Sequence, residues 1–232
     1  MTLPNQLTIS NASKLIAEKQ LTAINLLESC LDQIDQRDSL LKAWVTVDRQ
    51  QALETAGLLD RELEQTGPRS PLHGIPIGVK DIYYTKGLKT TACSKVYKDF
   101  IPDYDATSVK KLKTSGAIIL GKTVTTEFAA GDPPPTINPW SRSHTPGGSS
   151  SGSAVAIADR MVLGAMGSQT GGSIIRPSSY NGIVGLKPTY GRVSIYGVIP
   201  VSWSLDTIGP MVNCVEDAAL MLQSLSGYDH ND

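Results

Sequence analysis

The sequence predicts an α/β protein with a mixed, largely buried β-sheet flanked by helices. Segments with helical periodicity alternate with short apolar, β-branched segments along the whole chain. Short apolar strands between helices are typical of sheets that are covered on both faces. The 232 residues are 40% hydrophobic and 19% charged, which is enough to bury a large core. No internal repeat or linker is evident, so residues 1–232 are predicted to form one domain.

The first third of the chain carries clear helix and strand signals. An apolar stripe repeats at helical spacing in the second helix, and the first strand is β-branched and alternating. The predicted elements are a helix capped by Ser10 or Asn11 that runs through Lys19, a helix over 23–36 capped by Thr22, a strand over 41–47, and a helix over 49–65 that Gly67 and Pro68 end.

The rest of the chain is predicted to alternate in the same way. One residue, Lys80, is a charged residue inside an otherwise apolar strand, and its presence there needs a structural or chemical explanation. The predicted elements are a strand over 77–82, a helix over 107–115, a strand over 117–120, an extended loop over 132–139, short strands within 182–188 and 193–201, and a helix over 216–225.

The stretch from Pro146 to Pro177 contains two glycine-serine turns, over 146–153 and 167–173, joined by the apolar segment 154–166. Glycine permits backbone angles that let a turn aim its N–H groups at a substrate oxygen. A flexible Gly/Ser linker would not be followed by a core-like segment. The pattern therefore favours buried glycine turns at a chemical centre.

Charge and one decoy motif argue against two classes of function. The formal net charge is −1 and no basic patch stands out, so neither nucleic acid nor an anionic membrane is an expected partner. Residues 116–123, Gly-Ala-Ile-Ile-Leu-Gly-Lys-Thr, match the phosphate-loop pattern letter for letter. A phosphate loop needs a glycine-rich loop between a strand and a helix, whereas here the central residues are a β-type apolar run that follows a predicted helix. The context argues against nucleotide binding.

The cysteines and the N-terminal residues favour a cytoplasmic protein. Cys30, Cys93 and Cys214 lack metal-ligand spacing and leave one thiol over in any disulfide scheme, so reduced thiols are expected. The first residues lack a basic start with an apolar signal core, and no apolar run approaches the ~20 residues of a membrane span.

A serine nucleophile in these turns would need a general base. His73, His144 and His230 are each more plausibly structural or peripheral than catalytic, from their positions in the sequence. Lys80 is the alternative, because burial in an apolar strand lowers the pKa of an amine and makes a neutral base. Pairing with Asp81, or extension of the amine to water, is the competing explanation for Lys80.

Four long, ordered motifs resemble the amidase signature family. They are Gly-Ile-Pro-Ile-Gly-Val-Lys-Asp (74–81), Thr-Pro-Gly-Gly-Ser-Ser-Ser-Gly-Ser-Ala (145–154), Thr-Gly-Gly-Ser-Ile-Ile-Arg-Pro (170–177) and Gly-Leu-Lys-Pro-Thr-Tyr-Gly-Arg-Val-Ser (185–194). The resemblance implies an amidase signature fold and hydrolysis of a small-molecule amide, with neither metal nor organic cofactor.

The resemblance also implies a Ser-cisSer-Lys triad. Ser173 would be the nucleophile, Ser149 the bridging serine on a cis peptide after Gly148, and Lys80 the base. Ser150 would be a supporting hydroxyl. The implied oxyanion hole consists of the backbone N–H groups of Thr170, Gly171, Gly172 and Ser173.

Departures from the family pattern leave several points open. Many members have Asp before the Thr-Gly-Gly-Ser turn and Arg two residues after the nucleophile. This chain has Gln169 and Ile175 at those positions, with Arg176 one place later. This pattern is closer to small-molecule amidases than to the amidotransferase subunit. Our hypothesis is that Arg176 pairs with a substrate carboxylate, and a structural salt bridge is the alternative.

The length is a further departure, because members of the family usually run to about twice this chain. The sequence therefore resembles the N-terminal half of the family. Two partners are open from the sequence alone, namely a second copy of the chain in a homodimer or a partner chain that completes the fold. The alternative functions are those of a glutamyl-tRNA amidotransferase subunit, which would use glutamine as ammonia donor, or of a catalytically incomplete interaction subunit.

Overall fold

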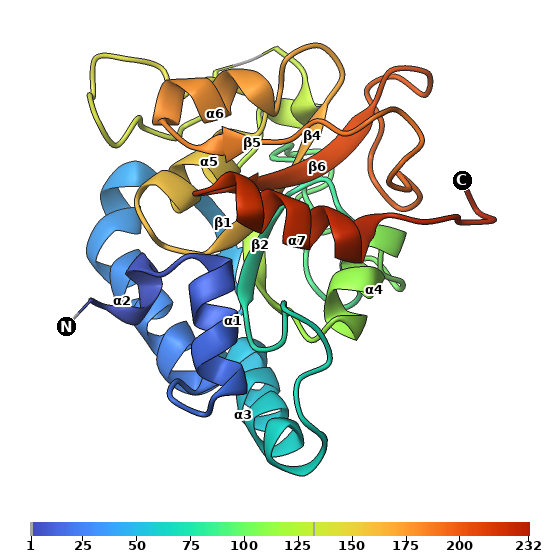
Figure 1. Ribbon diagram of the computed structural model, residues 1–232. Helices are drawn as coiled ribbons and strands as arrows, with labels where there is room; N and C mark the ends of the chain where they lie inside the picture. Colours follow the sequence, from blue (N-terminus) through green and yellow to red (C-terminus); the bar gives the residue numbers. More distant parts are fainter. Residues whose placement is uncertain (1, 132) are drawn as a thin grey trace.

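A computed structural model describes residues 2–131 and 133–232, and its centre is a six-stranded mixed sheet (Figure 1). The strand order is β1-β3-β2-β4-β6-β5, in which β2 is parallel to β3 and β4 and the other pairings are antiparallel. The strands are β1 (Trp44–Val47), β2 (Pro76–Lys80), β3 (Ile118–Thr123), β4 (Gly164–Gln169), β5 (Val184–Gly185) and β6 (Thr207–Val212). The predicted α/β fold with a mixed sheet is confirmed.

Seven α-helices and two short 3₁₀ helices accompany the sheet in the described part of the chain. The α-helices are α1 (Ile9–Ala17), α2 (Ala23–Leu41), α3 (Arg49–Thr66), α4 (Thr107–Thr114), α5 (Ser151–Ala158), α6 (Ile175–Asn181) and α7 (Val215–Leu225), and the 3₁₀ helices are η1 (Pro4–Gln6) and η2 (Glu127–Ala129). Every residue of β2, β4 and β6 is buried, as expected for strands covered on both faces.

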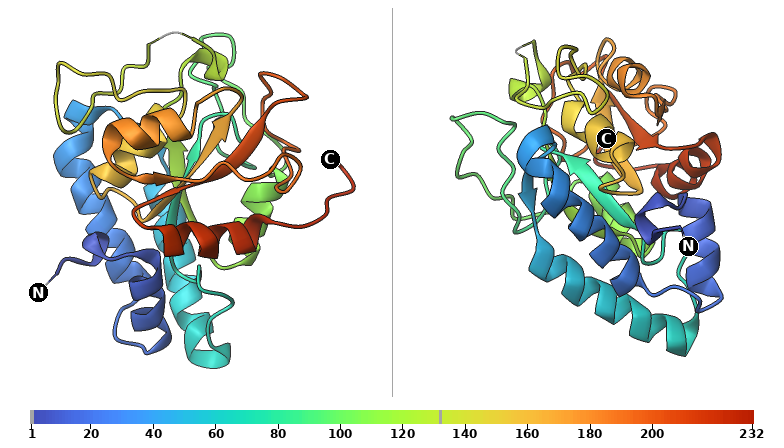
Figure 2. Two further views of the ribbon diagram at one scale, coloured as in Figure 1. Left: turned by 45° about the horizontal axis from the view of Figure 1, so that its top comes forward. Right: turned by 90° about the vertical axis from the view of Figure 1, so that its left-hand side faces the viewer.

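Helices cover the sheet on both faces, as two further views show (Figure 2). On one face a Cβ at Gly164 would lie 2.8 Å from Sδ of Met221 in α7 and 3.1 Å from Cδ1 of Ile9 in α1. On the other face a Cβ at Gly167 would lie 3.0 Å from Oγ of Ser150, just before α5. The absence of a side chain at these two positions of β4 therefore lets helices approach the sheet closely from both sides.

The N-terminal helices differ from the prediction at their ends. The hydroxyl of Thr8, rather than Ser10 or Asn11, caps α1 by accepting the N–H of Asn11. Thr22 caps α2 as predicted, but this helix continues to Leu41. The predicted strand over 41–47 therefore begins only at Trp44.

The phosphate-loop match falls on a strand. β3 runs to Thr123, three residues beyond the predicted end at Leu120, and it includes the Gly-Lys-Thr of the match. The segment therefore lacks the strand-loop-helix arrangement that phosphate binding requires. Lys122 is fully buried in this strand.

The C-terminal third contains the largest differences. The predicted strand over 193–201 is wrong: this segment makes one isolated bridge, between Val198 and Tyr83. Within 182–188 only the short β5 forms. The sequence analysis did not predict β6 or α6, whereas α7 lies within one residue of its predicted start and ends where predicted.

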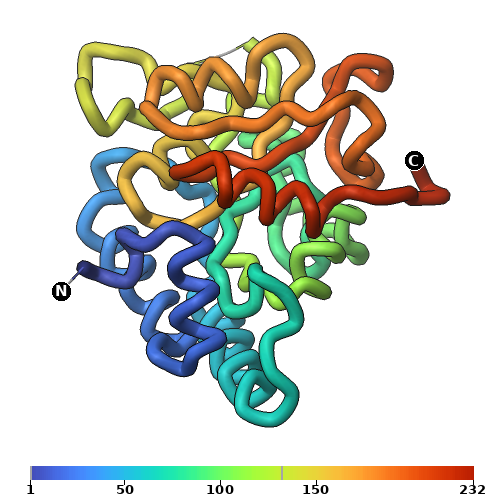
Figure 3. Tube along the Cα trace, viewed as in Figure 1, coloured from blue at the N-terminus to red at the C-terminus, as the bar shows by residue number. Residues whose placement is uncertain are grey.

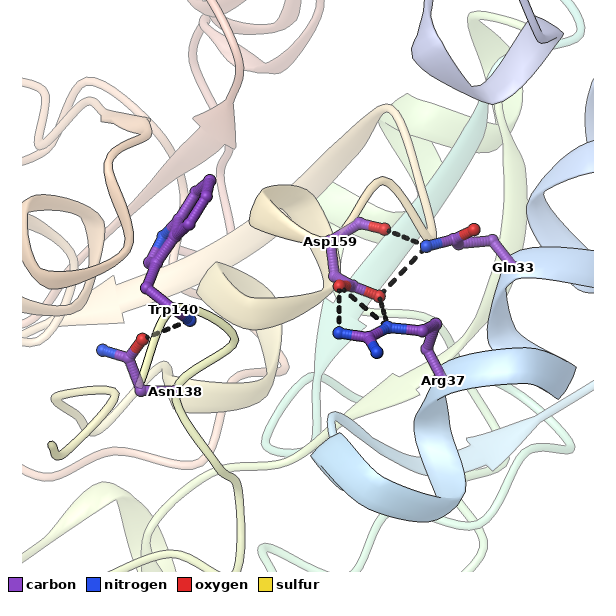
Figure 4. A network of polar contacts seen from close by, with 5 residues as sticks. All are labelled: Gln33, Arg37, Asn138, Trp140 and Asp159. Carbon is purple, nitrogen blue, oxygen red and sulfur yellow. Dashed lines mark hydrogen bonds and ion pairs between the residues drawn. The ribbon is translucent and has the colours of Figure 1, made fainter. Parts of the chain in front are cut away.

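The apolar segment 154–166 belongs to α5 and the start of β4, and a polar network holds the end of α5 (Figure 4). Arg37 of α2 donates through Nε and Nη2 to the carboxylate of Asp159, and Gln33 donates to its carbonyl over 2.8 Å. In the preceding loop, Asn138 Oδ1 accepts the N–H of Trp140 over 2.9 Å. The contacts of Arg37 and Gln33 with Asp159 therefore hold the C-terminal end of α5 against α2.

Three further observations bear on the predicted class of protein. Within residues 2–131 and 133–232, no helix is long and apolar enough to cross a membrane, and no group of His, Cys, Asp or Glu side chains could hold a metal ion. No disulfide joins Cys30, Cys93 or Cys214 within the described residues.

Candidate active site

Lys80 lies at the end of β2, fully buried in the centre of the sheet. Its Nζ donates to Oγ of Ser149 over 2.6 Å and to Oγ of Ser168 over 2.8 Å. Burial lowers the pKa of this amine to about 7, although Asp206 acts in the opposite direction. Lys80 therefore neither reaches water nor pairs with Asp81, and it can be neutral near physiological pH.

Ser149 lies in the first glycine-serine turn, which is buried as predicted. The peptide bond between Gly148 and Ser149 is cis, the geometry that the family resemblance implies. α5 begins directly afterwards, and a Cβ at Gly152 would collide with the backbone of Ala43 and Val124. This close approach explains the glycine in the first turn of α5 and places Ser149 against the sheet.

The two glycine-serine turns adjoin α5 and α6, which contact each other and lie in the yellow to orange part of the chain in Figure 3. The N–H of Ser150 donates to the carbonyl of Ser173 over 3.3 Å. Arg176 donates through Nε and Nη2 to the carbonyl of Gly148, over 3.1 and 2.7 Å. These bonds bring the predicted nucleophile segment next to the predicted bridging serine.

Ser150 connects the first turn to β4. Its hydroxyl accepts the N–H of Ser168 and donates to the carbonyl of the same residue, each over 3.2 Å. These bonds hold Ser150, for which the family resemblance implies a supporting role, against the strand that carries Ser168. Ser168, which binds Lys80, was missed by the sequence analysis, although it lies in the predicted glycine-serine segment 167–173. Residues 167–169 of that segment form the end of β4 rather than a turn.

The second turn differs from the prediction of a buried turn at its tip. Gly171 is exposed, and Thr170, Gly172 and Ser173 are partly exposed. Within the described residues, no hydrogen bond engages the N–H groups of residues 170–173 or the hydroxyl of Ser173. Four backbone donors and one hydroxyl at an accessible turn can meet a carbonyl group from solution.

Asp206, a second residue that the sequence analysis did not single out as functional, holds this turn. Its carboxylate accepts the hydroxyl of Thr170 and the N–H groups of Val201 and Ser202, the last two over 2.7 and 3.1 Å. The carboxylate is largely buried. Asp206 therefore joins the predicted oxyanion-hole turn to the loop that precedes β6.

Gln169 takes a defined structural role where the family pattern usually has Asp. Its Oε1 accepts the N–H groups of Ile174 and Ile175, both over 2.9 Å. The first N–H groups of a helix have no partner within the helix, so an acceptor here caps α6. The amide oxygen supplies that acceptor as a carboxylate would.

Arg176 lines a cavity of about 370 Å³ beside the first turn. Its walls include Thr126, Gly148 and Tyr180. The guanidinium binds the Gly148 carbonyl, and none of the ion pairs within the described residues includes it. The structural salt bridge considered from the sequence is therefore not what holds Arg176.

The histidines lie apart from these contacts. His73 is buried, and its ring bonds the carbonyl of Leu59 and the N–H of Arg69. His144 and His230 are exposed.

A buried amine bonded to a serine, beside a turn with unengaged N–H groups, has the parts that serine-dependent acyl transfer needs.

The chain belongs to the amidase family, whose model matches residues 25–232. It is 47% identical to the A subunit of glutamyl-tRNA(Gln) amidotransferase from Desulfatibacillum aliphaticivorans, over 98% of this chain and 48% of that relative. The corresponding protein of Trichlorobacter lovleyi is 46% identical, over 97% and 47% of the two chains.

Solved structures of an amidase and an amidotransferase subunit are similar to this chain as well. The peptide amidase of Stenotrophomonas maltophilia superposes with a TM-score of 0.93 at 38% identity, over 98% of this chain and 49% of that one. The A subunit of glutamyl-tRNA(Gln) amidotransferase from Thermotoga maritima gives a TM-score of 0.85 at 38% identity, over 99% and 48%. The chain spans about half the length of the curated relatives it matches.

Proposed function

We propose that this chain carries the catalytic residues of an amidase that hydrolyses the C–N bond of a small-molecule amide through an acyl-serine intermediate. The observation that carries the proposal is the 2.6 Å bond between Lys80 and Ser149 in the sheet interior. A buried amine with a pKa of about 7 is a base matched to neutral pH.

In the proposed reaction, neutral Lys80 accepts a proton from Ser149, which accepts one from Ser173. The Ser173 oxygen attacks the amide carbon, and the N–H groups of residues 170–173 bind the resulting oxyanion. Collapse breaks the C–N bond, with Ser149 protonating the leaving nitrogen and Lys80 returning its proton to Ser149. Water then attacks the acyl ester through the same relay, which releases the acid and restores Ser173.

The cavity beside Arg176 is the proposed place for the rest of the substrate. Two of the guanidinium donors are engaged by Gly148, which orients the group, and an arginine has five N–H donors in all. A carboxylate on the substrate could use the remaining donors. The proposal therefore favours small amides that also bear a carboxylate.

A second candidate is a glutaminase within an amidotransferase, because the most similar curated relatives include amidotransferase A subunits. Such a chain would release ammonia from glutamine and would act together with partner subunits. Glutaminase activity that rises at least tenfold when partner subunits are added would favour this candidate over the small-molecule amidase.

Association through an exposed apolar surface near the sheet edge is part of the proposal. The apolar side chains of Val201, Trp203 and Leu205 are all exposed in the loop before β6, and β5 at the sheet edge has only two residues. Exposed apolar side chains and open sheet edges favour association. Sedimentation velocity of the chain alone should show self-association that Trp203→Ser weakens, and a monomer at all concentrations would contradict this part of the proposal.

The function is tested by hydrolysis of a panel of primary amides with and without a carboxylate, and the release of ammonia measures the hydrolysis. The proposal expects turnover that is lost in Ser173→Ala. A folded chain that is inactive on every amide, alone and with a polypeptide that completes the relatives' length, would support the alternative of a non-catalytic interaction subunit.

A further inference from the structure

Tyr83 lies three residues beyond Lys80, fully buried, and it makes hydrogen bonds through both its backbone and its side chain. Its N–H donates to the carbonyl of Lys80 over 3.1 Å, which folds the chain back immediately after β2. Its hydroxyl donates to the carbonyl of Gly167 over 2.6 Å, in β4. Tyr83 thereby connects the segment that carries Lys80 to the neighbouring strand.

The bonded carbonyl directly precedes a residue that binds the candidate base. Gly167 shares its peptide unit with Ser168, and Oγ of Ser168 accepts a hydrogen bond from Nζ of Lys80 over 2.8 Å. The contacts form a closed ring that runs from the Lys80 backbone to Tyr83, Gly167, Ser168 and back to the Lys80 amine.

A second buried lysine fixes the other side of Tyr83. Nζ of Lys122 donates to the carbonyl of Tyr83 and to the hydroxyls of Thr85 and Thr90, over 3.2 and 3.0 Å for the two threonines. The backbone of Tyr83 is thus held on both sides. Burial also raises the pKa of its phenol well above the ordinary value, so the hydroxyl remains a donor.

From this geometry we infer that Tyr83 is a positioning residue for Lys80, acting through the Gly167 carbonyl and the Ser168 hydroxyl. A lysine side chain has four rotatable bonds and loses much rotamer freedom when it is fixed. The ring keeps the Lys80 amine in one place between Ser168 and Ser149. This inference rests on the proposed role of Lys80 as the base.

The test compares Tyr83→Phe with Tyr190→Phe in the full chain. Tyr190 provides a matched control because its hydroxyl also donates to a backbone carbonyl, that of Trp203 over 2.9 Å, but it is exposed. The chain is prepared with ¹³C-labelled lysine, and its NMR spectrum reports the two Hε protons of each lysine side chain. The Lys80 signal is identified as the one that is absent in Lys80→Arg. A fixed side chain gives them different shifts, and a mobile one averages them.

We expect two resolved Lys80 Hε shifts in the unmodified chain and in Tyr190→Phe, and one averaged or broadened signal in Tyr83→Phe. Ser168→Ala should have the same effect, because it removes the next link of the ring. Resolved shifts that persist in Tyr83→Phe, or averaged shifts in the unmodified chain, would overturn the inference.

Labelling of Ser173 by a fluorophosphonate supplies a second readout. Tyr83→Phe should slow this labelling about tenfold, which is the effect of losing one hydrogen bond of ordinary strength. When Ser168→Ala is already present, Tyr83→Phe should slow labelling by less than about twofold more, because the link to Lys80 is already broken. Independent effects of the two substitutions would contradict action through Ser168. If Lys80→Ala labels as fast as the unmodified chain, the proposed function fails, and the Hε shifts still decide whether Tyr83 positions the amine.

Discussion

The Lys80 amine and the Ser149 hydroxyl are 2.6 Å apart in the interior of the sheet, in a protein where the three histidines take no part in this contact. Burial lowers the pKa of Lys80 to about 7. The neutral amine is the form that accepts a proton, and its fraction grows as pH rises through that value.

The rate of Ser173 modification by a fluorophosphonate should therefore rise about tenfold per pH unit below about pH 7 and level off above about pH 8. The measurement is the second-order labelling constant from pH 5.5 to 9.5, corrected for hydrolysis of the reagent. A rate that keeps rising up to pH 9.5 without levelling off, as an exposed lysine would give, would contradict a buried base.

Lys122 gives a separate prediction about stability. Burial lowers its pKa to about 7 as well, while the unfolded chain keeps the ordinary value of 10.5. Between these values the unfolded state binds more protons than the folded state, so the free energy of unfolding increases with pH across this window.

Each buried lysine should contribute about 1 kcal/mol per pH unit between pH 7.5 and 8.5. Urea unfolding at several pH values in this range should show a smaller slope in Lys122→Met than in the unmodified chain, whatever the absolute stability of the variant. Lys110→Met, at an exposed position of α4, is the control and should keep the slope. Equal slopes in all three proteins would mean that Lys122 titrates normally.

Asp206 should matter for the turn over residues 170–173. Asp206→Asn keeps the shape of the side chain but weakens its bonds to Thr170 and to the N–H groups of Val201 and Ser202. We expect labelling of Ser173 to slow about tenfold, because a charge-assisted hydrogen bond is replaced by a neutral one. Asp99→Asn, an exposed control, should label at the original rate. An unchanged rate in Asp206→Asn would show that Asp206 is not needed to hold the turn in the form in which Ser173 is labelled.

Arg176→Met should raise KM for amides that carry a carboxylate by about tenfold or more and should leave KM for neutral amides within about twofold. The physical reason is the loss of a guanidinium at the cavity beside the first turn. Steady-state hydrolysis of matched acidic and neutral amides measures this. An equal loss on both would show that Arg176 acts only by holding the Gly148 carbonyl.

The sequence predicted elements whose signals are local. Thr22 is a good capping residue followed by an apolar stripe, and α2 begins where that pattern places it. Lys80 was identified because a charged residue inside an apolar strand is unusual, and the structure places it among serines. The glycine-serine turns were found through composition alone.

The parts that the sequence did not predict depend on contacts between distant segments. β6 contains Gly209 and Pro210, which weaken a strand signal, yet it pairs with all of β4. Segment 193–201 has the apolar pattern of a strand, but among the described residues its strand pairing is limited to the single bridge between Val198 and Tyr83. Asp206 and Tyr83 carry no local mark of their roles, because their partners lie 36 and 84 residues away in the chain.

The most direct test of the central claim is fluorophosphonate labelling of the purified, folded chain, with the modified peptide mapped by mass spectrometry. The account predicts modification at Ser173 that falls at least a hundredfold in Lys80→Ala and disappears in Ser173→Ala. Modification that maps to another serine, or that is equally fast without Lys80, would contradict the proposal that Lys80 activates Ser173 through Ser149.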